Sequence, residues 1–330
     1  MKNEKLDIIF IFAIAVTLII ILIILLSDTP LSTIYFFFIG PFRNIFSFGN
    51  MLNSSVPFIF GALGIIIAIK AGSMNLGGEG QVYLGAFITT IVALKLSEFS
   101  IIGAIIAVIT GSIFSGALAA FSGFCKAKWN TNELITTFLI SCAVIPIVNY
   151  LVTGPFLDPQ TSLLSTKKIT ESMRLSLILK PSGLSFGFIF AIVFIFIVHF
   201  FLNKTRKGYE FRMAGHNEMF ARYGGINTKL NTVLAMFLSG VLYGLAGSMA
   251  VLGTHHAVIK EFSSGLGWSG LTVALIAFFS PIAVVPCAVF LAWINSGARI
   301  AMQNTGLTFE VTFIVQAVIF ILAAVKRRTK

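Results

Sequence analysis

The sequence predicts an all-α integral membrane protein of about ten transmembrane helices, with short or broken helices near its centre. Of its 330 residues, 57% are hydrophobic and only 11% are charged, whereas about 25% of a soluble globular domain is charged. The hydrophobic residues form unbroken runs of about 20, the length a helix needs to cross a bilayer. A membrane β-barrel would alternate apolar and polar residues instead. These observations exclude a soluble enzyme and a nucleic-acid-binding module.

The charge of the chain also fits a membrane protein. It carries 23 Lys and Arg residues and 12 Asp and Glu residues, for a formal net charge of +11. Basic residues concentrate in the cytoplasmic loops of inner-membrane proteins. We therefore interpret the excess as a sign of orientation in the lipid bilayer, and we expect no nucleic acid as a partner. The three cysteines are far apart and are typical of small core residues.

The first apolar run, residues 8–26, predicts an uncleaved span that leaves the N-terminus in the cytoplasm. It is longer than the apolar core of about 7–15 residues in a signal peptide, and the Ser27-Asp28-Thr29-Pro30 segment after it is a poor cleavage site. Six more spans follow, separated at one point by a polar interval that predicts a long external loop. The spans are 53–70, 82–97, 101–124, 132–152, 185–202 and 230–252, and the loop is 153–184.

The last apolar region, residues 268–325, predicts three further spans. Ser280-Pro281 interrupts it, and the residue before a proline disfavours helix. Ten crossings keep both termini cytoplasmic and place fifteen of the 23 Lys and Arg residues on the cytoplasmic side, as the positive-inside rule favours. The three spans are 268–279, 281–299 and 309–325.

Residues 70–81 form a first polar island, which holds four glycines with Asn75, Glu79 and Gln81 between two apolar runs. Irregular backbone at membrane depth is tolerated only where protein or a water-filled cavity covers it, and broken helices often mark transport pathways. An ionisable residue there, Glu79, is a candidate functional residue. A cytoplasmic loop with glycine turns explains the same composition, and the spacing does not separate the two interpretations.

A second polar island, residues 203–229, predicts a short exposed helix. Asn217 is a typical N-cap and Gly224-Gly225 a typical helix end. Met219, Phe220 and Tyr223 then cluster on one side of the helix, by their i,i+3 and i,i+4 spacing. Such an apolar stripe indicates docking on a partner or, alternatively, on the bilayer surface.

A third polar segment, residues 253–270, predicts an external or re-entrant loop. His255 and His256 are adjacent, so their side chains diverge and do not predict a metal site. Trp268 is typical of an interfacial anchor or of an aromatic wall for a planar ligand. The chain has no phosphate-binding loop and no catalytic constellation. We expect no enzyme activity, no catalytic residue, no cofactor and no metal, and ATP-driven work would require a partner.

Five motifs occur in a fixed order between residues 50 and 325. They are Ala71-Gly-Ser-Met-Asn-Leu-Gly-Gly-Glu-Gly-Gln81, Asn132-Glu133-Leu-Ile-Thr-Thr, Arg212-x-x-Gly215-x-Asn217-x-x-x-Ala221-Arg222-Tyr223-x-Gly225-Ile226-Asn227, Gly240-x-x-x-Gly244-Leu-Ala-Gly247 and Gly267-Trp-Ser-Gly270-Leu-Thr-Val-Ala-Leu. Together they resemble ABC-importer permeases for nucleosides that work with a BMP-type substrate-binding lipoprotein. These permeases are a branch of the ribose and branched-chain amino acid permease superfamily. Met74 and Phe278-Phe279-Ser280 depart from the family pattern.

The resemblance implies a single transmembrane permease domain over residues 1–330, built as two inverted halves in the plasma membrane of a bacterium. The implied partners are an ABC ATP-binding subunit, a second permease subunit and the substrate-binding lipoprotein. The expected parts are an N-terminal span with an external segment (1–52), the core of the first half (53–152), the external loop (153–184), the second half (185–325) and a cytoplasmic tail (326–330).

The resemblance also implies site residues. The cytoplasmic loop 212–227 would couple to the ATPase through Arg212, Gly215, Asn217, Ala221, Arg222, Gly225 and Ile226. A nucleoside is uncharged and offers hydroxyls and an aromatic base, so the candidates for the substrate path are Asn75, Glu79, Gln81 and Trp268. Glu79 and Glu133 fit equally a structural role, in which they cap helix ends or pair with a cation.

Two other functions remain open at this point. Within the same class, the cargo would be a ribose-like sugar or a branched-chain amino acid. In another class, the chain would be a stand-alone secondary transporter or channel, which needs coupling ions and buried charges near the middle of the membrane. The sequence has few such charges, and its loop 212–227 favours docking on a partner.

Overall fold

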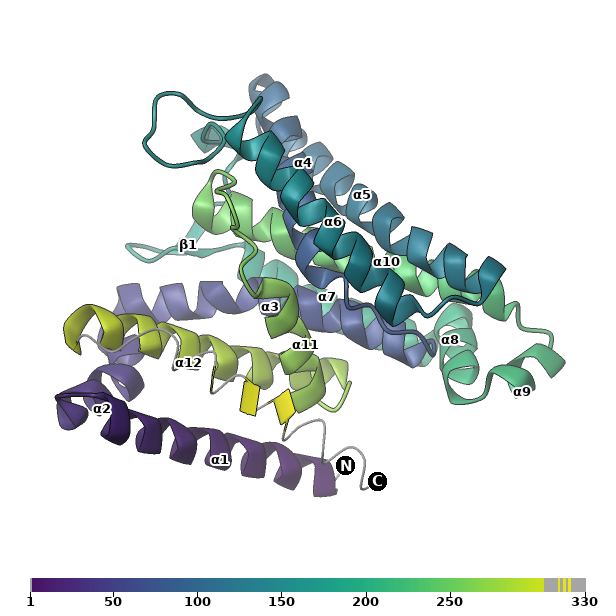
Figure 1. Ribbon diagram of the computed structural model, residues 1–330, viewed down its shortest axis with the longest axis horizontal. Coiled ribbons are helices and arrows are strands. Elements are labelled where there is room, and N and C mark those ends of the chain that lie inside the picture. Colours follow the sequence, from purple (N-terminus) through teal and green to yellow (C-terminus); the bar gives the residue numbers. More distant parts are fainter. Residues whose placement is uncertain (1, 306–313, 315–316, 319, 322–330) are drawn as a thin grey trace.

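The computed structural model describes residues 2–305, 314, 317–318 and 320–321, and these form a mostly helical protein (Figure 1). One group of helices, at the lower left of Figure 1, contains α1 (Lys2–Leu26), α2 (Pro30–Phe38), the 3₁₀ turn η1 (Gly40–Phe42) and α12 (Val284–Thr305). A second group contains α4 (Gly78–Lys95), α5 (Ser100–Trp129), α6 (Glu133–Thr153) and α10 (Thr228–Ala250). Between them lie α3 (Ile45–Lys70) and the short α11 (Leu266–Ile276), and α7 (Gly187–Lys204) packs on α3.

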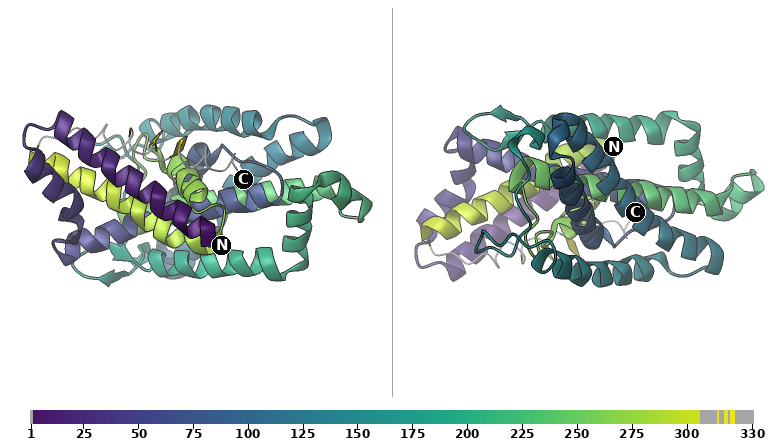
Figure 2. Two further views of the ribbon diagram at one scale, coloured as in Figure 1. Left: turned by 90° about the horizontal axis from the view of Figure 1, so that it is seen from below. Right: turned by 90° about the horizontal axis from the view of Figure 1, so that it is seen from above.

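The remaining elements lie mainly at the two ends of the molecule. Helices α8 (Arg206–His216) and α9 (Glu218–Tyr223) project from one end (Figures 1 and 2). The short elements outside the main helices are η2 (Ser97–Phe99), η3 (Glu171–Met173), β1 (Leu177–Leu179), β2 (Leu184–Ser185), the π-helical turn η4 (Val251–His255) and η5 (Pro281–Ala283). The antiparallel pair β1–β2 is a small departure from the predicted all-α class. It provides backbone partners within a long connection that no helix spans.

Seven of the described helical segments are long and apolar enough to cross a membrane. They are Ile9–Leu26, Ile45–Lys70, Ser97–Trp129, Glu133–Thr153, Gly187–Lys204, Thr228–His255 and Pro281–Thr305. Helix α4 has 18 residues, but its first turn contains Glu79 and Gln81, and α11 has only 11 residues. The integral membrane class is therefore supported, whereas the count of ten stays a prediction. Apart from isolated positions, the predicted span 309–325 lies outside the described residues, as does the tail 326–330.

Two predicted span starts were wrong for local reasons. Helix α3 begins at Ile45 instead of residue 53, because the Asn44 side chain accepts a hydrogen bond from the Ser47 N–H at 2.7 Å and caps the helix. Helix α4 begins at Gly78, inside the first polar island. The predicted start at residue 281 agrees with the apolar segment Pro281–Thr305, in which Pro281 opens the 3₁₀ turn η5 and α12 follows from Val284.

The core of the molecule is centred on α3 and α10. In the apolar stretches of these two helices, 83% and 72% of the residues are buried, compared with 22% in the apolar stretch of α1. The glycine pattern Gly240-x-x-x-Gly244, which is typical of close helix packing, performs that role here. A Cβ at Gly240 would approach the Gly116 Cα of α5 to 2.9 Å, and one at Gly244 would approach the Ser112 Cα to 2.7 Å.

Candidate functional site

Two helices begin at the centre of the molecule, and their first turns touch. Helix α4 starts at Gly78 and α11 starts at Leu266. A Cβ added at Gly267 would overlap the backbone of Gly78 and Glu79, so only glycine permits this approach. Each helix end carries backbone N–H groups without partners in its own helix and a partial positive charge. The contact therefore brings two electropositive helix ends together.

The carboxylate of Glu79 lies between these two helix ends. Its Oε1 accepts a hydrogen bond from the Gly265 N–H at 2.6 Å, and its Oε2 accepts one from the Gly267 N–H at 2.7 Å. Because Glu79 is in the first turn of α4, one negative charge meets the positive ends of both helices. Glu79 thus links the first polar island to the third.

Asn75 and Gln81 form a reciprocal amide pair near the contact between α4 and α11. The Asn75 Nδ2 donates to the Gln81 Oε1 at 2.8 Å, and the Gln81 Nε2 donates back to the Asn75 Oδ1 at 2.9 Å. The Asn75 Nδ2 also donates to the Ser239 Oγ of α10 at 3.0 Å. Asn75 is 0% exposed and Gln81 is 2% exposed. Both amides therefore have protein partners in this conformation.

Trp268 is placed differently from the other three candidates. It lies in the first turn of α11, is 42% exposed, and its ring meets the Phe138 ring of α6 edge-on, with the ring centroids 6.5 Å apart. A cavity of about 10 Å³, enough for one water molecule at most, separates Trp268 from Asn75, Glu79 and Tyr243. The structure thus brings three of the four predicted path residues to one small cavity and leaves the fourth, Gln81, behind Asn75.

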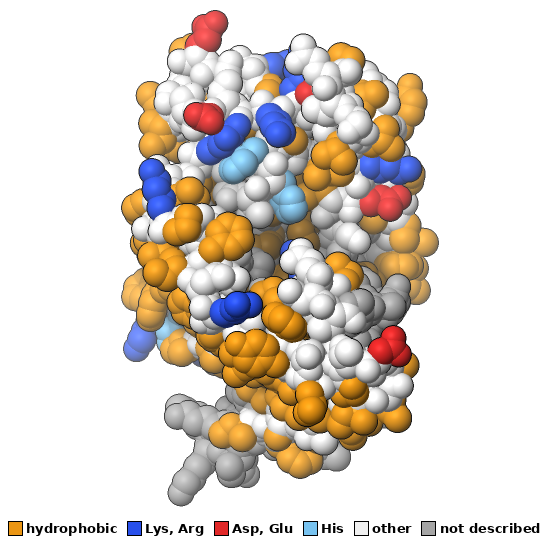
Figure 3. Space-filling view, turned by 90° about the vertical axis from the view of Figure 1, so that its left-hand side faces the viewer, with side chains coloured by type: hydrophobic (Ala, Val, Ile, Leu, Met, Phe, Trp, Pro, Cys, Tyr) orange, Lys and Arg blue, Asp and Glu red, His pale blue; other side chains and the backbone are white. Residues whose placement is uncertain are grey.

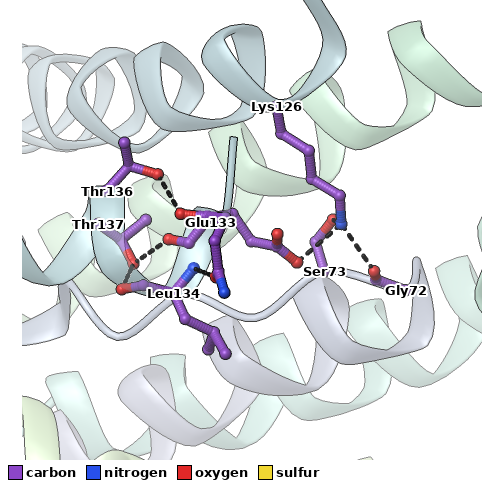
Figure 4. Close-up of polar contacts among 8 residues, drawn as sticks. Gly72, Ser73, Lys126, Glu133, Leu134, Thr136 and Thr137 are labelled. Carbon is purple, nitrogen blue, oxygen red and sulfur yellow. Dashed lines mark hydrogen bonds and ion pairs between the residues drawn. The ribbon is translucent and has the colours of Figure 1, made fainter. Parts of the chain in front are cut away.

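The irregular segment 71–77 is held by α5 and α6. The Lys126 Nζ donates to the Gly72 carbonyl at 3.1 Å and to the Ser73 Oγ at 3.3 Å, and it pairs with the Glu133 carboxylate at 2.7 Å (Figure 4). Glu133 is therefore paired with a cation, which is the structural alternative considered above. The Leu76 N–H donates to the Thr137 Oγ at 3.1 Å. Lys126 and Thr137 were not among the predicted site residues, because their partners in this segment, Gly72, Ser73 and Leu76, lie more than fifty positions away in the chain.

The predicted docking loop forms the helical hairpin α8–α9. The Asn217 Oδ1 accepts a hydrogen bond from the Phe220 N–H at 3.0 Å and caps α9, as predicted. Gly225 ends α9 with φ of 78°, and the Ile226 N–H donates to the Ala221 carbonyl at 3.0 Å, which is a Schellman ending. Both boundaries of the predicted short helix are confirmed.

The other predicted loop residues have distinct positions. Ala221 is 1% exposed and packs inward, whereas Tyr223, Met219 and Phe220 are 86%, 63% and 61% exposed. Arg222 pairs with Glu218 at 2.6 Å. Arg212 lies half-buried in α8. The exposed apolar stripe is therefore present, and Ala221 supports it from behind.

Helix α8 also touches the first polar island. A Cβ at Gly215 would overlap the Lys70 carbonyl, and one at Gly72 would approach the Gly215 Cα to 3.1 Å. Gly72 has φ of 75°, which favours glycine. Two glycines thus let the hairpin lie directly against the turn that leads from α3 into residues 71–77.

Two cavities flank α9. One has a volume of about 390 Å³ and lies between α8 and α9, lined by residues that include Tyr209, Glu210, Met213 and Phe220. The other has a volume of about 350 Å³ and lies toward the end of α5. At the first cavity, a hydrogen bond from Lys207 lowers the pKa of the Glu210 carboxyl.

The opposite end of the molecule carries the long connection after α6. It is tied to the loop after α10, since the Thr166 N–H donates to the Val258 carbonyl at 2.9 Å and the Lys260 N–H donates to the Leu164 carbonyl at 2.8 Å. Figure 3 shows Lys, Arg and His side chains around a hollow at this end. Burial, with Arg174 nearby, lowers the pKa of His256, which favours its neutral form. No group of three metal-ligating side chains occurs among the described residues.

Comparison with known proteins gives consistent similarities. Residues 47–324 match the family described as the permease component of branched-chain amino acid transport systems. A probable riboflavin import permease of Treponema pallidum, RfuC, is 34% identical over 91% of this chain and 80% of its own length. The guanosine ABC transporter permease NupP of Bacillus subtilis is 31% identical over 86% of this chain and 83% of its own length. The nucleoside ABC transporter permease NupB of Lactococcus lactis is 28% identical over 88% of this chain and 82% of its own length. No solved structure matches the chain significantly.

Proposed function

The chain belongs to the family of permease components of branched-chain amino acid transport systems, and we propose that its cargo is a nucleoside. It is a multi-pass protein of the bacterial plasma membrane and the permease of an ABC importer. It is a transport component and not an enzyme. Permeases of this kind work with an ATP-binding subunit and a substrate-binding protein. In our proposal, that subunit hydrolyses ATP, the binding protein is a lipoprotein, and a second permease subunit completes the path.

The proposed topology has ten crossings with both termini in the cytoplasm. Helices α4 and α11 would supply two short crossings beside the seven long ones, and residues 309–325 would supply the last. The α8–α9 hairpin would then face the cytoplasm, and the end that carries the connection after α6 would face outward. The lysines and arginines around α8 and α9 support this orientation.

The nature of the central contact supports an uncharged cargo. The only carboxylate that borders the central cavity, within the described residues, is Glu79, and it is already engaged by two backbone N–H groups. What remains accessible is the Trp268 ring beside Phe138. An aromatic face stacks well with a planar base. We infer that Trp268 contacts the cargo, and that Asn75, Glu79 and Gln81 hold the two helix ends that position it.

Contacts between α8 and the first polar island support a coupling path. The ATP-binding subunit would dock on Met219, Phe220 and Tyr223 of α9. Movement of the hairpin would pass through the contact between Gly215 and Gly72 into residues 71–77 and then to Glu79 and α11. A shift between outward-open and inward-open states would then follow from ATP binding on the partner.

Uptake by cells provides the test of the cargo. Cells without this chain should lose uptake of radiolabelled guanosine and adenosine but retain ribose uptake. The wild-type gene should restore the nucleoside uptake. Replacement of Trp268 by Ala should raise KM for the nucleoside about tenfold, the loss of roughly 1.4 kcal/mol of stacking, while Trp268→Phe should retain most affinity. Loss of ribose uptake alone would contradict the proposal.

Riboflavin is the second candidate cargo, because the relative named for riboflavin import is 34% identical to this chain. Like a nucleoside, riboflavin is uncharged and combines a planar ring system with a hydroxylated chain, so the same Trp268 face would suit it. Radiolabelled riboflavin in the same uptake experiment separates the two. Uptake of riboflavin and not of guanosine would support the permease function but would identify riboflavin as the cargo instead of a nucleoside.

A further inference from the structure

We propose that the second cavity beside α9 binds the phosphate headgroup of an anionic phospholipid. This cavity has a volume of about 350 Å³ and lies between the last turn of α5, α9 and the first turn of α10. Its lining contains four cations and one carboxylate, namely Lys126, Lys128, Arg222, Lys229 and Glu218. The proposal does not depend on the identity of the cargo.

Two of these cations are free to meet an anion. Lys126 pairs with Glu133 at 2.7 Å, and Arg222 pairs with Glu218 at 2.6 Å. In the part of the chain that the structure describes, Lys128 and Lys229 have no carboxylate within ion-pair distance. The cavity therefore has uncompensated positive charge from two helices, which suits one phosphate bound between them.

The length of α5 indicates a lipid. Helix α5 has 30 residues, so it is about 45 Å long and exceeds a hydrocarbon core of about 30 Å. Its last turn, with Lys128, would therefore lie among the lipid headgroups. Trp129 and Phe124 beside it are 59% and 43% exposed, as expected for side chains at the interface.

The aromatic side chains also orient the free lysine. The Lys128 Nζ lies 5.2 Å from the Trp129 ring and 5.5 Å from the Phe124 ring, within cation–π distance. A basic cavity next to exposed aromatic rings offers a charged place for a headgroup and an apolar surface for its acyl chains. Basic pockets between helices on the cytoplasmic side are suited to such headgroups.

The surface of α9 distinguishes this cavity from the proposed docking stripe. Glu218 and Arg222, four residues apart, share the side of α9 that lines the cavity. Met219 and Tyr223, also four residues apart, share a different side, and neither lines either cavity. A protein seated on the stripe would thus leave the cavity to another occupant. A bound phosphate would bridge α5 and α10 and hold α9 against the membrane domain.

The test uses the full chain, purified in detergent and analysed by native mass spectrometry. Wild-type protein should retain phosphatidylglycerol in preference to phosphatidylcholine. The double variant Lys128→Gln/Lys229→Gln should bind phosphatidylglycerol about 30-fold more weakly, at about 1 kcal/mol per lysine. The matched variant Lys204→Gln, which removes an exposed cation at the end of α7, should bind like the wild type, and Lys128→Arg/Lys229→Arg should restore binding.

Four results would overturn the proposal. Equal retention of the two lipids, or unchanged binding by the double Gln variant with an unchanged melting temperature, would remove the lipid site. Displacement of phosphatidylglycerol by an equimolar amount of inorganic phosphate would indicate a site for a free anion. If the double Gln variant keeps its phosphatidylglycerol but no longer copurifies with the ATP-binding subunit, the cavity belongs to a protein interface.

Discussion

The centre of the molecule and its α8–α9 end are both polar and rich in glycine, yet they are built in opposite ways. At the centre, Asn75 and Gln81 are almost fully buried, and the cavity beside Glu79 has a volume of only about 10 Å³. At the α8–α9 end, Tyr223 is 86% exposed, and cavities of about 390 and 350 Å³ flank α9. The centre supplies its own partners, whereas this end leaves its surfaces open to other molecules.

The reason for the difference lies in where the glycines act. At Gly267 the missing side chain lets two helices meet, so that Glu79 reaches N–H groups on both. At Gly225 the positive φ only ends α9 and turns the chain away. Glycine also permits a close contact at this end, at Gly215 of α8, but the turn at Gly225 leaves α9 itself exposed. At the centre, a variant that removes a hydrogen-bond partner should therefore reduce the stability of the protein. At the α8–α9 end, a variant that removes an exposed side chain should reduce function instead.

The largest expected effect is at Glu79. Replacement by Leu leaves the Gly265 and Gly267 N–H groups without acceptors, and each buried unsatisfied group costs about 1–3 kcal/mol. We expect a loss of about 4 kcal/mol in unfolding free energy, measured by thermal melting of the purified protein. Glu79→Gln retains one acceptor and should lose about half as much.

The exposed Glu171 provides a matched control, since its side chain is 90% exposed and pairs with Arg174 at 3.6 Å. Glu171→Leu should change the unfolding free energy by less than about 0.5 kcal/mol. If the Glu79→Leu variant had the same melting temperature as this control, the carboxylate would not stabilise the contact between the two helix ends. The contrast with the α8–α9 end would then be wrong.

The second effect is functional and concerns α9. Replacement of both Met219 and Tyr223 by Ala should remove the docking stripe and reduce ATP-driven uptake about 30-fold, as expected for a loss of about 2 kcal/mol at an interface hot spot. Because both side chains are exposed, the melting temperature and membrane insertion should stay unchanged. Leu31→Ala, at an 85% exposed position on α2, should have normal uptake. Normal uptake by the double variant would contradict the docking role.

The two regions also differ in how well the sequence predicted them. The start and end of α9 follow from Asn217 and Gly225, which act on their own neighbours, and so a local pattern sufficed. The partners of Glu79 are 186 and 188 positions away in the chain. No local pattern contains such a contact, and the sequence left the role of Glu79 open for this reason.

The predicted edges of the spans show the same limit. Hydropathy located the apolar runs that became α5, α6, α7 and α10, because burial in lipid depends on composition. It placed the start of α3 too late, since the polar residues Asn53 and Ser55 of this helix are buried. The Asn53 Oδ1 accepts a hydrogen bond from the Ser185 N–H of β2 at 3.1 Å. Composition alone does not distinguish a polar residue in water from one with a protein partner.

A third, smaller effect concerns the Asn75–Gln81 pair. A double-mutant cycle with Asn75→Ala and Gln81→Ala should give a coupling energy of about 1–2 kcal/mol, since two buried hydrogen bonds link the side chains. The melting temperatures of both single variants and the double variant provide the measurement. Additive losses would show that the two amides act independently, and they would then be available to the cargo as path residues.

The smallest expected effect is at Glu210, near the open end. The hydrogen bond from Lys207 lowers the pKa of this carboxyl below its ordinary value of 4.5, so the folded state favours the charged form. The resulting stabilisation is present above pH 4.5 and is lost as the pH falls through the lowered pKa. For a pair at the surface it should be below about 1 kcal/mol.

Lys207→Gln tests this, with Lys204→Gln as the control for removal of a positive charge. At pH 7 the Lys207 variant should melt slightly below the wild type, and the difference should disappear when both are acidified below the lowered pKa of Glu210. A difference that persisted in acid would have another cause than this pair. A loss at pH 7 as large as that of Glu79→Leu would mean that α8 is held as firmly as the centre, and the contrast between the two regions would then fail.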